Sequence, residues 1–184
     1  AAFDLFDDNN DGLVDGAELA AGLGSLCGGR HDVKVRLCFD LFDADNDGNL
    51  DLYVCNYGLW SFADNPYCAE QGIQLYCSPK IIKASPDAYY RNLGDGTFED
   101  ATETSGLASR AGRAQGVVAA DVNADGFLDI YVGNDLNANS FYLNDGTGKF
   151  RDETELSGVG YDSRGNSQAG MGVDAADYNR DGLI

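Results

Sequence analysis

The apolar positions of the chain follow two different periods. Near the N-terminus, Val33, Leu37 and Leu41 recur at every fourth position, which predicts an amphipathic helix over residues 33–42. From about residue 50 onward, short apolar runs such as Leu52–Val54 and Ile130–Val132 alternate with Gly- and Asp-rich turns, a pattern typical of strands. We therefore expect a small helical segment over residues 1–49, followed by a mostly β segment over residues 50–184.

The predicted β segment is built from repeats. Residues 90–106 match residues 142–158 at a constant offset of 52 positions, and residues 116–126 match residues 172–182 at an offset of 56. The strands of the central copy are predicted at Gly116–Ala120, Leu128–Val132, Ser140–Leu143 and Lys149–Thr154. Four antiparallel strands at this period are typical of a propeller blade. The chain is predicted to hold about two blades and the start of a third, which makes a partial propeller.

A partial propeller leaves two alternatives open. A closed propeller needs about 4–8 blades, and an open stack leaves sheet edges unpaired, which native proteins seldom tolerate. Either the chain is a fragment of a longer protein, or neighbouring subunits complete the sheet. The second alternative predicts head-to-tail homo-polymeric association, which generates a filament where it does not close.

An acidic loop of the form Asp-x-Asp/Asn-x-Asp-Gly occurs four times, beginning at Asp7, Asp43, Asp121 and Asp177. Oxygen atoms at alternate positions of such a loop converge on one hard cation, and the Gly permits the sharp turn around it. Because every candidate ligand is oxygen, Ca²⁺ is the expected ion, in up to four sites. The candidate ligands are Asp7, Asn9, Asp11, Leu13, Asp15, Glu18, Asp43, Asp45, Asp47, Asn49, Asp51, Asp121, Asn123, Asp125, Phe127, Asp129, Asp177, Asn179, Asp181 and Leu183.

The four loops differ in their closing residues and in the segments after them. The first loop completes the EF-hand pattern with Glu18 at position 12, and residues 17–23 are predicted to form its exiting helix. The second loop has Val54 at position 12 and is closed instead by Asp51 at position 9, so we expect an EF-hand entrance joined to a strand. Val14 and Leu50 share position 8, where paired EF-hands form a short β contact, so the first two loops are expected to pack together.

The third and fourth loops belong to the predicted blades. The third is closed at position 9 by Asp129, with the carbonyl of Phe127 as a further ligand. The fourth ends at Ile184, one residue short of its position 9. Both loops are expected to connect the first two strands of a blade.

These motifs resemble those of known families. The loop of Asp7 resembles an EF-hand. Residues 43–184 resemble the FG-GAP/VCBS repeats of integrin α-type β-propellers, in the cartilage-acidic-protein-like (ASPIC/UnbV-associated) branch; the motifs that carry this resemblance are Tyr76–Pro79, Tyr90–Phe98 and Gln168–Tyr178. The resemblance implies an extracellular, calcium-stabilised scaffold used in adhesion or matrix contacts.

The charge of the chain limits its partners. Twelve Lys and Arg against thirty-one Asp and Glu give a net charge of −19. Such an acidic chain is not expected to bind nucleic acid or anionic membranes, and no apolar run approaches the ~18 residues of a membrane span. The expected partner is a protein or glycan of the extracellular matrix or a cell surface.

The five cysteines predict an oxidising compartment. Cys68 and Cys77 bracket an irregular segment, and a disulfide between them is expected to staple it. Cys27 and Cys38 are a second candidate pair, whereas Cys55 lies in an apolar strand and is expected to be a buried thiol. Disulfides together with calcium loops favour a secreted protein.

Three functions compete on the sequence alone. The first is a structural or adhesion module in which calcium rigidifies the loops. The second is a calcium sensor, which requires a Met-rich exit helix, although the single methionine is Met171. The third is a fragment of a carbohydrate-active enzyme, but the carboxylates occur at calcium-loop spacing and the single histidine, His31, lies in a Gly-rich turn. We expect the first function and no enzymatic activity.

Overall fold

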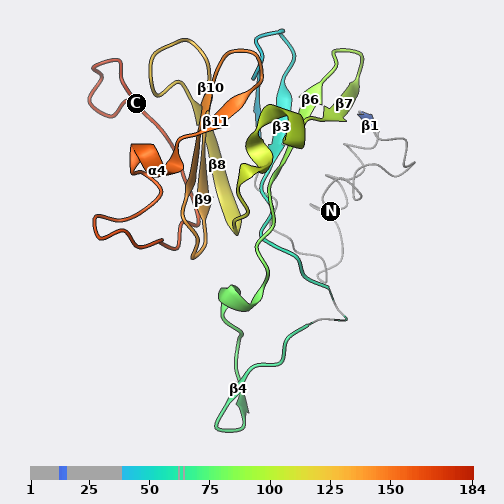
Figure 1. The fold of residues 1–184 in the computed structure, drawn as a ribbon, viewed down its shortest axis with the longest axis vertical. Helices are drawn as coiled ribbons and strands as arrows, with labels where there is room; N and C mark the ends of the chain where they lie inside the picture. Colours follow the sequence, from blue (N-terminus) through green and yellow to red (C-terminus); the bar gives the residue numbers. More distant parts are fainter. Residues whose placement is uncertain (1–12, 16–38, 62, 64) are drawn as a thin grey trace.

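The computed structural model describes residues 13–15, 39–61, 63 and 65–184. Two antiparallel sheets dominate these residues and pack against each other (Figure 1). The first sheet has the strand order β1-β7-β6-β3-β2, with bounds Leu13–Asp15, Thr97–Asp100, Ala88–Asn92, Asp51–Val54 and Phe39–Phe42. The second has the order β11-β10-β9-β8, with bounds Phe150–Asp152, Ser140–Asn144, Asp129–Asn134 and Ala114–Ala120.

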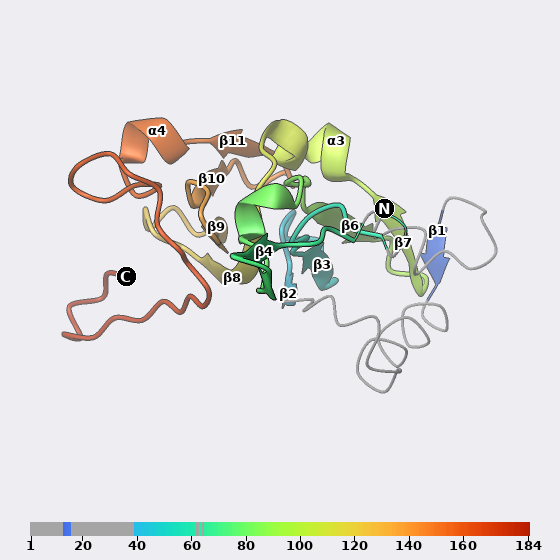
Figure 2. The ribbon, with the colours of Figure 1, turned by 90° about the horizontal axis from the view of Figure 1, so that it is seen from below.

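The remaining elements are short. They are β4 (Ala69–Glu70), β5 (Ile73–Gln74), the 3₁₀ turns η1 (Pro79–Ile81) and η2 (Leu107–Ser109), and the helices α3 (Thr102–Ser105) and α4 (Thr154–Ser157). The helices follow the last strand of each sheet and lie along the same side of the molecule (Figure 2). None of the helices in the described part of the chain has the length and apolar character needed to cross a bilayer.

The two sheets share one plan, which confirms the predicted four-stranded repeat. We call β2, β3, β6 and β7 blade 1, and β8 to β11 blade 2. In each blade, consecutive strands are neighbours in the sheet, and an acidic loop joins the first strand to the second. Phe39 faces Val54 across β2 and β3, and Val117 faces Val132 across β8 and β9. The mostly β class and the four strands predicted over residues 116–154 are therefore confirmed.

The predicted helix over residues 33–42 is wrong where the structure describes it. Residues 39–42 form β2, the first strand of blade 1, and pair antiparallel with β3. The same apolar residues that recur at every fourth position also alternate at every second position from Val33 to Leu41. This period of two suits a strand, and the edge of β3 supplies the hydrogen-bonding partner. Blade 1 therefore begins with a strand, β2, in place of the predicted helix. The division at residues 49 and 50 stays a prediction, although β2 lies on its N-terminal side.

The expected contact between Val14 and Leu50 is also wrong. Val14 lies in β1 and faces Phe98 of β7, whereas Leu50 lies outside any strand and is 53% exposed. β7 is the last strand of blade 1 and presents an edge whose backbone groups need partners. The backbone of residues 13–15 fills that edge and turns the four-stranded blade into a five-stranded sheet. The rest of the first loop and its predicted exit helix lie outside the described residues.

The hydrophobic core lies between the two blades. Blade 1 contributes Phe42, Tyr53 and Tyr89, and blade 2 contributes Ile130, Val132, Tyr142 and Phe150; all are buried. The ring of Phe150 lies edge-on to Phe42 and Tyr89, at centroid distances of 6.5 and 6.0 Å. This aromatic contact between blades is favourable beyond the area that it buries.

The blades differ most in the connection between their second and third strands. Residues 55–87 make this connection in blade 1, whereas residues 135–139 suffice in blade 2. The long connection projects from one end of the molecule, with β4 near its tip (Figure 1). A disulfide between Cys68 and Cys77 links the two sides of its β4–β5 hairpin, as predicted, and Cys55 is buried and is not part of a disulfide. The other candidate pair, Cys27 and Cys38, lies outside the described residues.

Candidate calcium-binding loops

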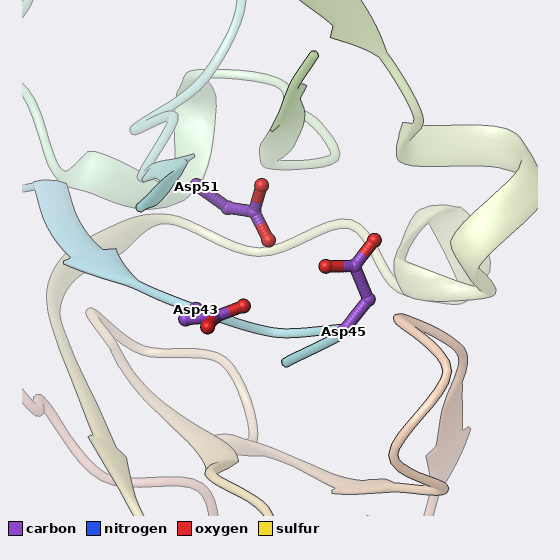
Figure 3. Close-up of side chains that lie close together, drawn as sticks. All are labelled: Asp43, Asp45 and Asp51. Atoms are coloured by element: carbon purple, nitrogen blue, oxygen red, sulfur yellow. The ribbon is translucent and has the colours of Figure 1, made fainter. Parts of the chain in front are cut away.

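The loop from Asp43 to Asp51 joins β2 to β3. The carboxylates of Asp43, Asp45 and Asp51 converge there, each with an oxygen within 4.8 Å of the other two (Figure 3). The backbone folds around Asp43, whose two carboxylate oxygens accept the amides of Asp47 at 3.1 Å and Gly48 at 2.9 Å. Gly48 has φ +90°, which L side chains rarely adopt. The sequence motif has thus brought three acids into one cluster.

Asp51 ties this loop to the core of blade 1. Its side chain is fully buried and accepts hydrogen bonds from Ala44 N at 3.0 Å, Tyr89 OH at 2.7 Å and Asn92 N at 2.8 Å. Burial raises the pKa of the Asp51 carboxyl, although these three donors favour the charged form and oppose the shift. A cation bound in this loop would also favour the charged form of the carboxylate.

Asp45 offers the clearest test of whether the loop fits a metal ion. Its Oδ1 is buried, and no donor among the described residues lies within hydrogen-bond distance of it. Buried polar atoms in native proteins nearly always have a partner. An oxygen-binding cation between the three carboxylates would supply it, and the donor set suits Ca²⁺. The residues present therefore fit the ion that the motif predicts.

The loop from Asp121 to Asp129 has the same backbone and a weaker charge. Asp121 accepts the amides of Asp125 at 3.1 Å and Gly126 at 2.9 Å. Asp129 is buried and accepts Val122 N at 3.2 Å and Asn144 N at 2.9 Å. Burial raises its pKa against these donors.

Two neutral residues distinguish the loop of Asp121 from the loop of Asp43. Asn123 takes the place of Asp45, and its Nδ2 donates to Asp125 Oδ2 at 2.8 Å. Phe141 takes the place of Tyr89 at the repeat offset of 52, so no equivalent phenol can donate to Asp129. Within the part of the chain that the structure describes, the three-carboxylate cluster occurs in the loop of Asp43 alone.

The loop of Asp177 repeats the local turn at an exposed position. Asp177 accepts the amides of Asp181 at 3.1 Å and Gly182 at 2.7 Å, and Asp181 accepts the amide of Leu183 at 3.0 Å. Asn179 donates to Asp181 Oδ2 at 2.8 Å, as Asn123 does to Asp125. The loop therefore repeats the hydrogen-bonded turn of the other two loops at positions 1 to 7.

Comparison with known families agrees with this geometry. The family model described as "FG-GAP-like repeat" matches residues 81–132 and 121–184, which together make up more than half of the chain. The chain belongs to the FG-GAP-like repeat family. A second model, described as "EF hand", matches residues 1–23 and 35–52 of this FG-GAP-like repeat protein and points to calcium binding. The second of these matches covers β2 and the loop of Asp43, which the structure places in blade 1.

A human relative of this FG-GAP-like repeat protein is named Cartilage acidic protein 1. It is 33% identical over 87 residues, which are 47% of this chain and 13% of the human protein. The chain therefore matches only a small part of that relative's length.

The structure accounts for the predicted ligands of this FG-GAP-like repeat protein unevenly. Asp7, Asn9, Asp11 and Glu18 lie outside the described residues, and Leu13 and Asp15 belong to the backbone of β1. In the loop of Asp43, Asp47 Oδ1 accepts Asn49 N at 2.8 Å and Asn49 Nδ2 at 3.0 Å. In the loop of Asp121, Asp125 Oδ1 accepts Phe127 N at 2.9 Å. The bonds from Asn49 N and Phe127 N hold the residues at position 7 in the turn.

Three supporting residues were not predicted from the sequence. Tyr89, Asn92 and Asn144 all donate to the buried acids at position 9. A signal for the two asparagines exists in the repeat, because Tyr90-Arg91-Asn92 and Tyr142-Leu143-Asn144 lie 52 positions apart. Their role was hidden because their partners lie 41 and 15 residues away in the chain.

Proposed function

We propose that this FG-GAP-like repeat protein is an extracellular structural or adhesion module in which bound Ca²⁺ rigidifies the loops of its blades. The observation that carries the proposal is the cluster of Asp43, Asp45 and Asp51, with its buried and unsatisfied Asp45 oxygen. A cation there would neutralise three converging carboxylates and fix the loop that joins β2 to β3. It supplies charge and coordination, and no chemical step is required of it.

The ligands of each proposed site follow from the loop positions. In blade 1 they are the side chains of Asp43, Asp45, Asp47 and Asp51 with the carbonyl of Asn49. In blade 2 they are Asp121, Asn123, Asp125 and Asp129 with the carbonyl of Phe127. The loops of Asp7 and Asp177 complete the proposed total of up to four sites.

The proposed location is extracellular. The disulfide between Cys68 and Cys77 supports it, because such bonds persist in oxidising compartments. The net charge of −19 supports a calcium-rich setting, since divalent cations offset the repulsion of the carboxylates. The resemblance to Cartilage acidic protein 1 is in keeping with this proposal.

The proposed partner is a protein or glycan of the matrix or a cell surface. Residues 57–86 support a contact surface, because they contain two acids and two lysines in an otherwise acidic chain. Several large apolar side chains among the described residues of this segment are solvent-exposed, at 56% for Leu59, 73% for Tyr67 and 67% for Ile73. Exposed apolar side chains gathered in one segment favour a binding role for it. Head-to-tail association of this chain is a further proposal for how the blades are continued.

Thermal unfolding with and without calcium tests the proposed function. Calcium that binds only the folded state stabilises it by about 2.7 kcal/mol at 100 times its Kd, so the Tm should rise in calcium and fall in EGTA. Asp45→Ala should remove much of this gain, and Glu103→Gln, at an acid in α3 outside the loops, should retain it. A Tm that is indifferent to millimolar calcium would contradict the proposal. A protein that stays folded in EGTA but exposes apolar surface in calcium would indicate a sensor instead.

A further inference from the structure

Asn144 touches both calcium-binding loops of the described blades. It stands at the end of β10 and is only 5% exposed. Its Nδ2 donates to the carbonyl of Ala44, in the loop of blade 1, at 2.9 Å. The same Nδ2 donates to the carbonyl of Leu128 at 3.0 Å, and its backbone N donates to Asp129 Oδ1 at 2.9 Å, both in the loop of blade 2.

The turn after Asn144 adds a second contact to the loop of blade 1. Gly148 lies so close to that loop that a Cβ added to it would be 3.2 Å from the Cβ of Asp45. Gly146 faces the ring of Phe127, which leaves no room for a Cβ there. The turn between β10 and β11 is therefore wedged between Asp45 on one side and Phe127 on the other.

We propose that Asn144 is a positioning residue that couples the calcium site of Asp43–Asp51 to that of Asp121–Asp129. Calcium in the loop of blade 1 fixes Asp45 and, with it, the carbonyl of Ala44 next to it. The hydrogen bonds of Asn144 to Leu128 and Asp129 then hold the end of the loop of blade 2 in place. Each ion then binds more tightly when the other is present. This inference rests on the proposed function, because it requires both loops to bind calcium.

Blade 1 contains the matched control. Asn92 is the repeat equivalent of Asn144 and makes the same bonds within its own blade: its N donates to Asp51 Oδ1 at 2.8 Å, and its Nδ2 donates to Leu50 O at 3.0 Å. Its Oδ1 accepts Gly94 N at 3.0 Å, as that of Asn144 accepts Gly146 N at 2.9 Å. Only Asn144 adds a bond to the other blade. A comparison of the two asparagines therefore separates coupling from local support of a loop.

The test reads each loop separately in the full chain. The amides of Gly48 and Gly126 donate to the first Asp of their loops, so their NMR resonances report calcium binding at each site. In the unmodified background, Asp45→Ala should raise the calcium midpoint read at Gly126 by about 5-fold or more, the usual range of coupling between sites. By reciprocity, Asp121→Ala should raise the midpoint read at Gly48 by the same factor.

Asn144→Ala should abolish this coupling, so that Asp45→Ala no longer moves the Gly126 midpoint, whereas Asn92→Ala should leave the coupling intact. If Asn144→Ala does not fold, Asn144→Ser, with a shorter polar side chain that does not reach Ala44, takes its place. Two results would overturn the inference. One is coupling that survives in the Asn144 variants; the other is a Gly126 midpoint that Asp45→Ala does not shift when Asn144 is present. Glycine resonances that do not respond to calcium at all would instead contradict the proposed function.

Discussion

Blade 1 and blade 2 have the same backbone plan but place different charges in it. Both have four consecutive strands, an acidic loop between the first two, and an asparagine at the end of the third that supports a buried acid. At three equivalent positions blade 1 has an acid or a phenol where blade 2 has a neutral residue without a phenol. The pairs are Asp45 and Asn123, Tyr89 and Phe141, and Asp87 and Asn139.

The repeat therefore fixes the backbone of both blades, whereas single side chains determine how many ionisable groups each blade contains. Asn139 Oδ1 accepts Asn134 N at 2.8 Å, and its Nδ2 donates to Tyr131 OH at 2.9 Å. Asp87 occupies the same place in blade 1, but it accepts both Asn56 N at 2.7 Å and Tyr53 OH at 2.8 Å. The residue that makes these two hydrogen bonds is thus a neutral amide in blade 2 and an ionisable carboxyl in blade 1. Blade 1 should therefore respond more strongly to cations and pH.

The largest expected effect is the loss of stability when the buried acid at position 9 of a loop is removed, and this loss should be larger in blade 1 than in blade 2. Asp51→Ala leaves the donors of Ala44, Tyr89 and Asn92 unpaired, whereas Asp129→Ala leaves those of Val122 and Asn144. Since each buried unsatisfied donor costs about 1–3 kcal/mol, we expect losses of about 4 and about 2–3 kcal/mol. Urea unfolding in EGTA, which removes the contribution of the metal, measures both. Equal losses would show that the third donor to Asp51 adds no stability.

A smaller effect concerns the pH dependence of stability. Burial raises the pKa of Asp87 to about 7, although the bonds from Asn56 and Tyr53 lower it in part. The folded state therefore keeps a proton between the ordinary pKa of 3.8 and about 7 while the unfolded state has lost it, so stability falls as the pH rises through this window. Because the residue is partly exposed, we expect a loss of about 1–2 kcal/mol rather than the full shift.

Asp87→Asn gives blade 1 the neutral amide that blade 2 has at the equivalent position, Asn139. The unfolding free energy of the variant should vary less between pH 4 and 8 than that of the unmodified chain, and it should be higher at pH 8. Chemical denaturation at both pH values measures this. A variant that keeps the original pH profile would assign the dependence to other groups.

An effect of similar size concerns the phenol of Tyr89. Tyr89→Phe copies Phe141 and removes the 2.7 Å hydrogen bond to Asp51. A hydrogen bond to a charged group contributes about 1.5–3 kcal/mol, and two other donors remain on Asp51, so we expect a loss at the low end, about 1.5 kcal/mol. The exchange Phe141→Tyr is the matched control, since Asp129 already has its own donors. A loss for Tyr89→Phe no larger than the change for Phe141→Tyr would remove this distinction between the blades.

The sequence predicted blade 2 well and blade 1 less well, for physical reasons. The short connection of residues 135–139 keeps the pattern of blade 2 local, so alternation and turns reveal its strands. Blade 1 is interrupted by residues 55–87, and its first strand precedes a loop that also matches the EF-hand pattern. The spacing of Val33, Leu37 and Leu41 satisfies both periods, and only pairing with β3 decides between them.

The candidate site divides in the same way. The acidic loops and the disulfide of Cys68 and Cys77 follow from spacing, because both are local features of the chain. The roles of Tyr89 and Asn144 do not, because they depend on contacts 38 and 100 residues apart in sequence. The predicted partner of Val14 was wrong for the same reason. The sequence pattern indicates that Val14 lies in a strand, but the pairing partner is determined by the unpaired edge of β7, which is distant in sequence.

We propose that calcium fixes the loop of Asp43 and, through Asn144, the turn between β10 and β11. Hydrogen exchange by mass spectrometry, with calcium and with EGTA, tests it most directly. Removal of calcium should expose the backbone of residues 43–51 and of the turn 144–149 to exchange together, because these segments touch through Ala44 and Asn144. Equal protection of both segments in calcium and in EGTA would contradict the proposed role of calcium.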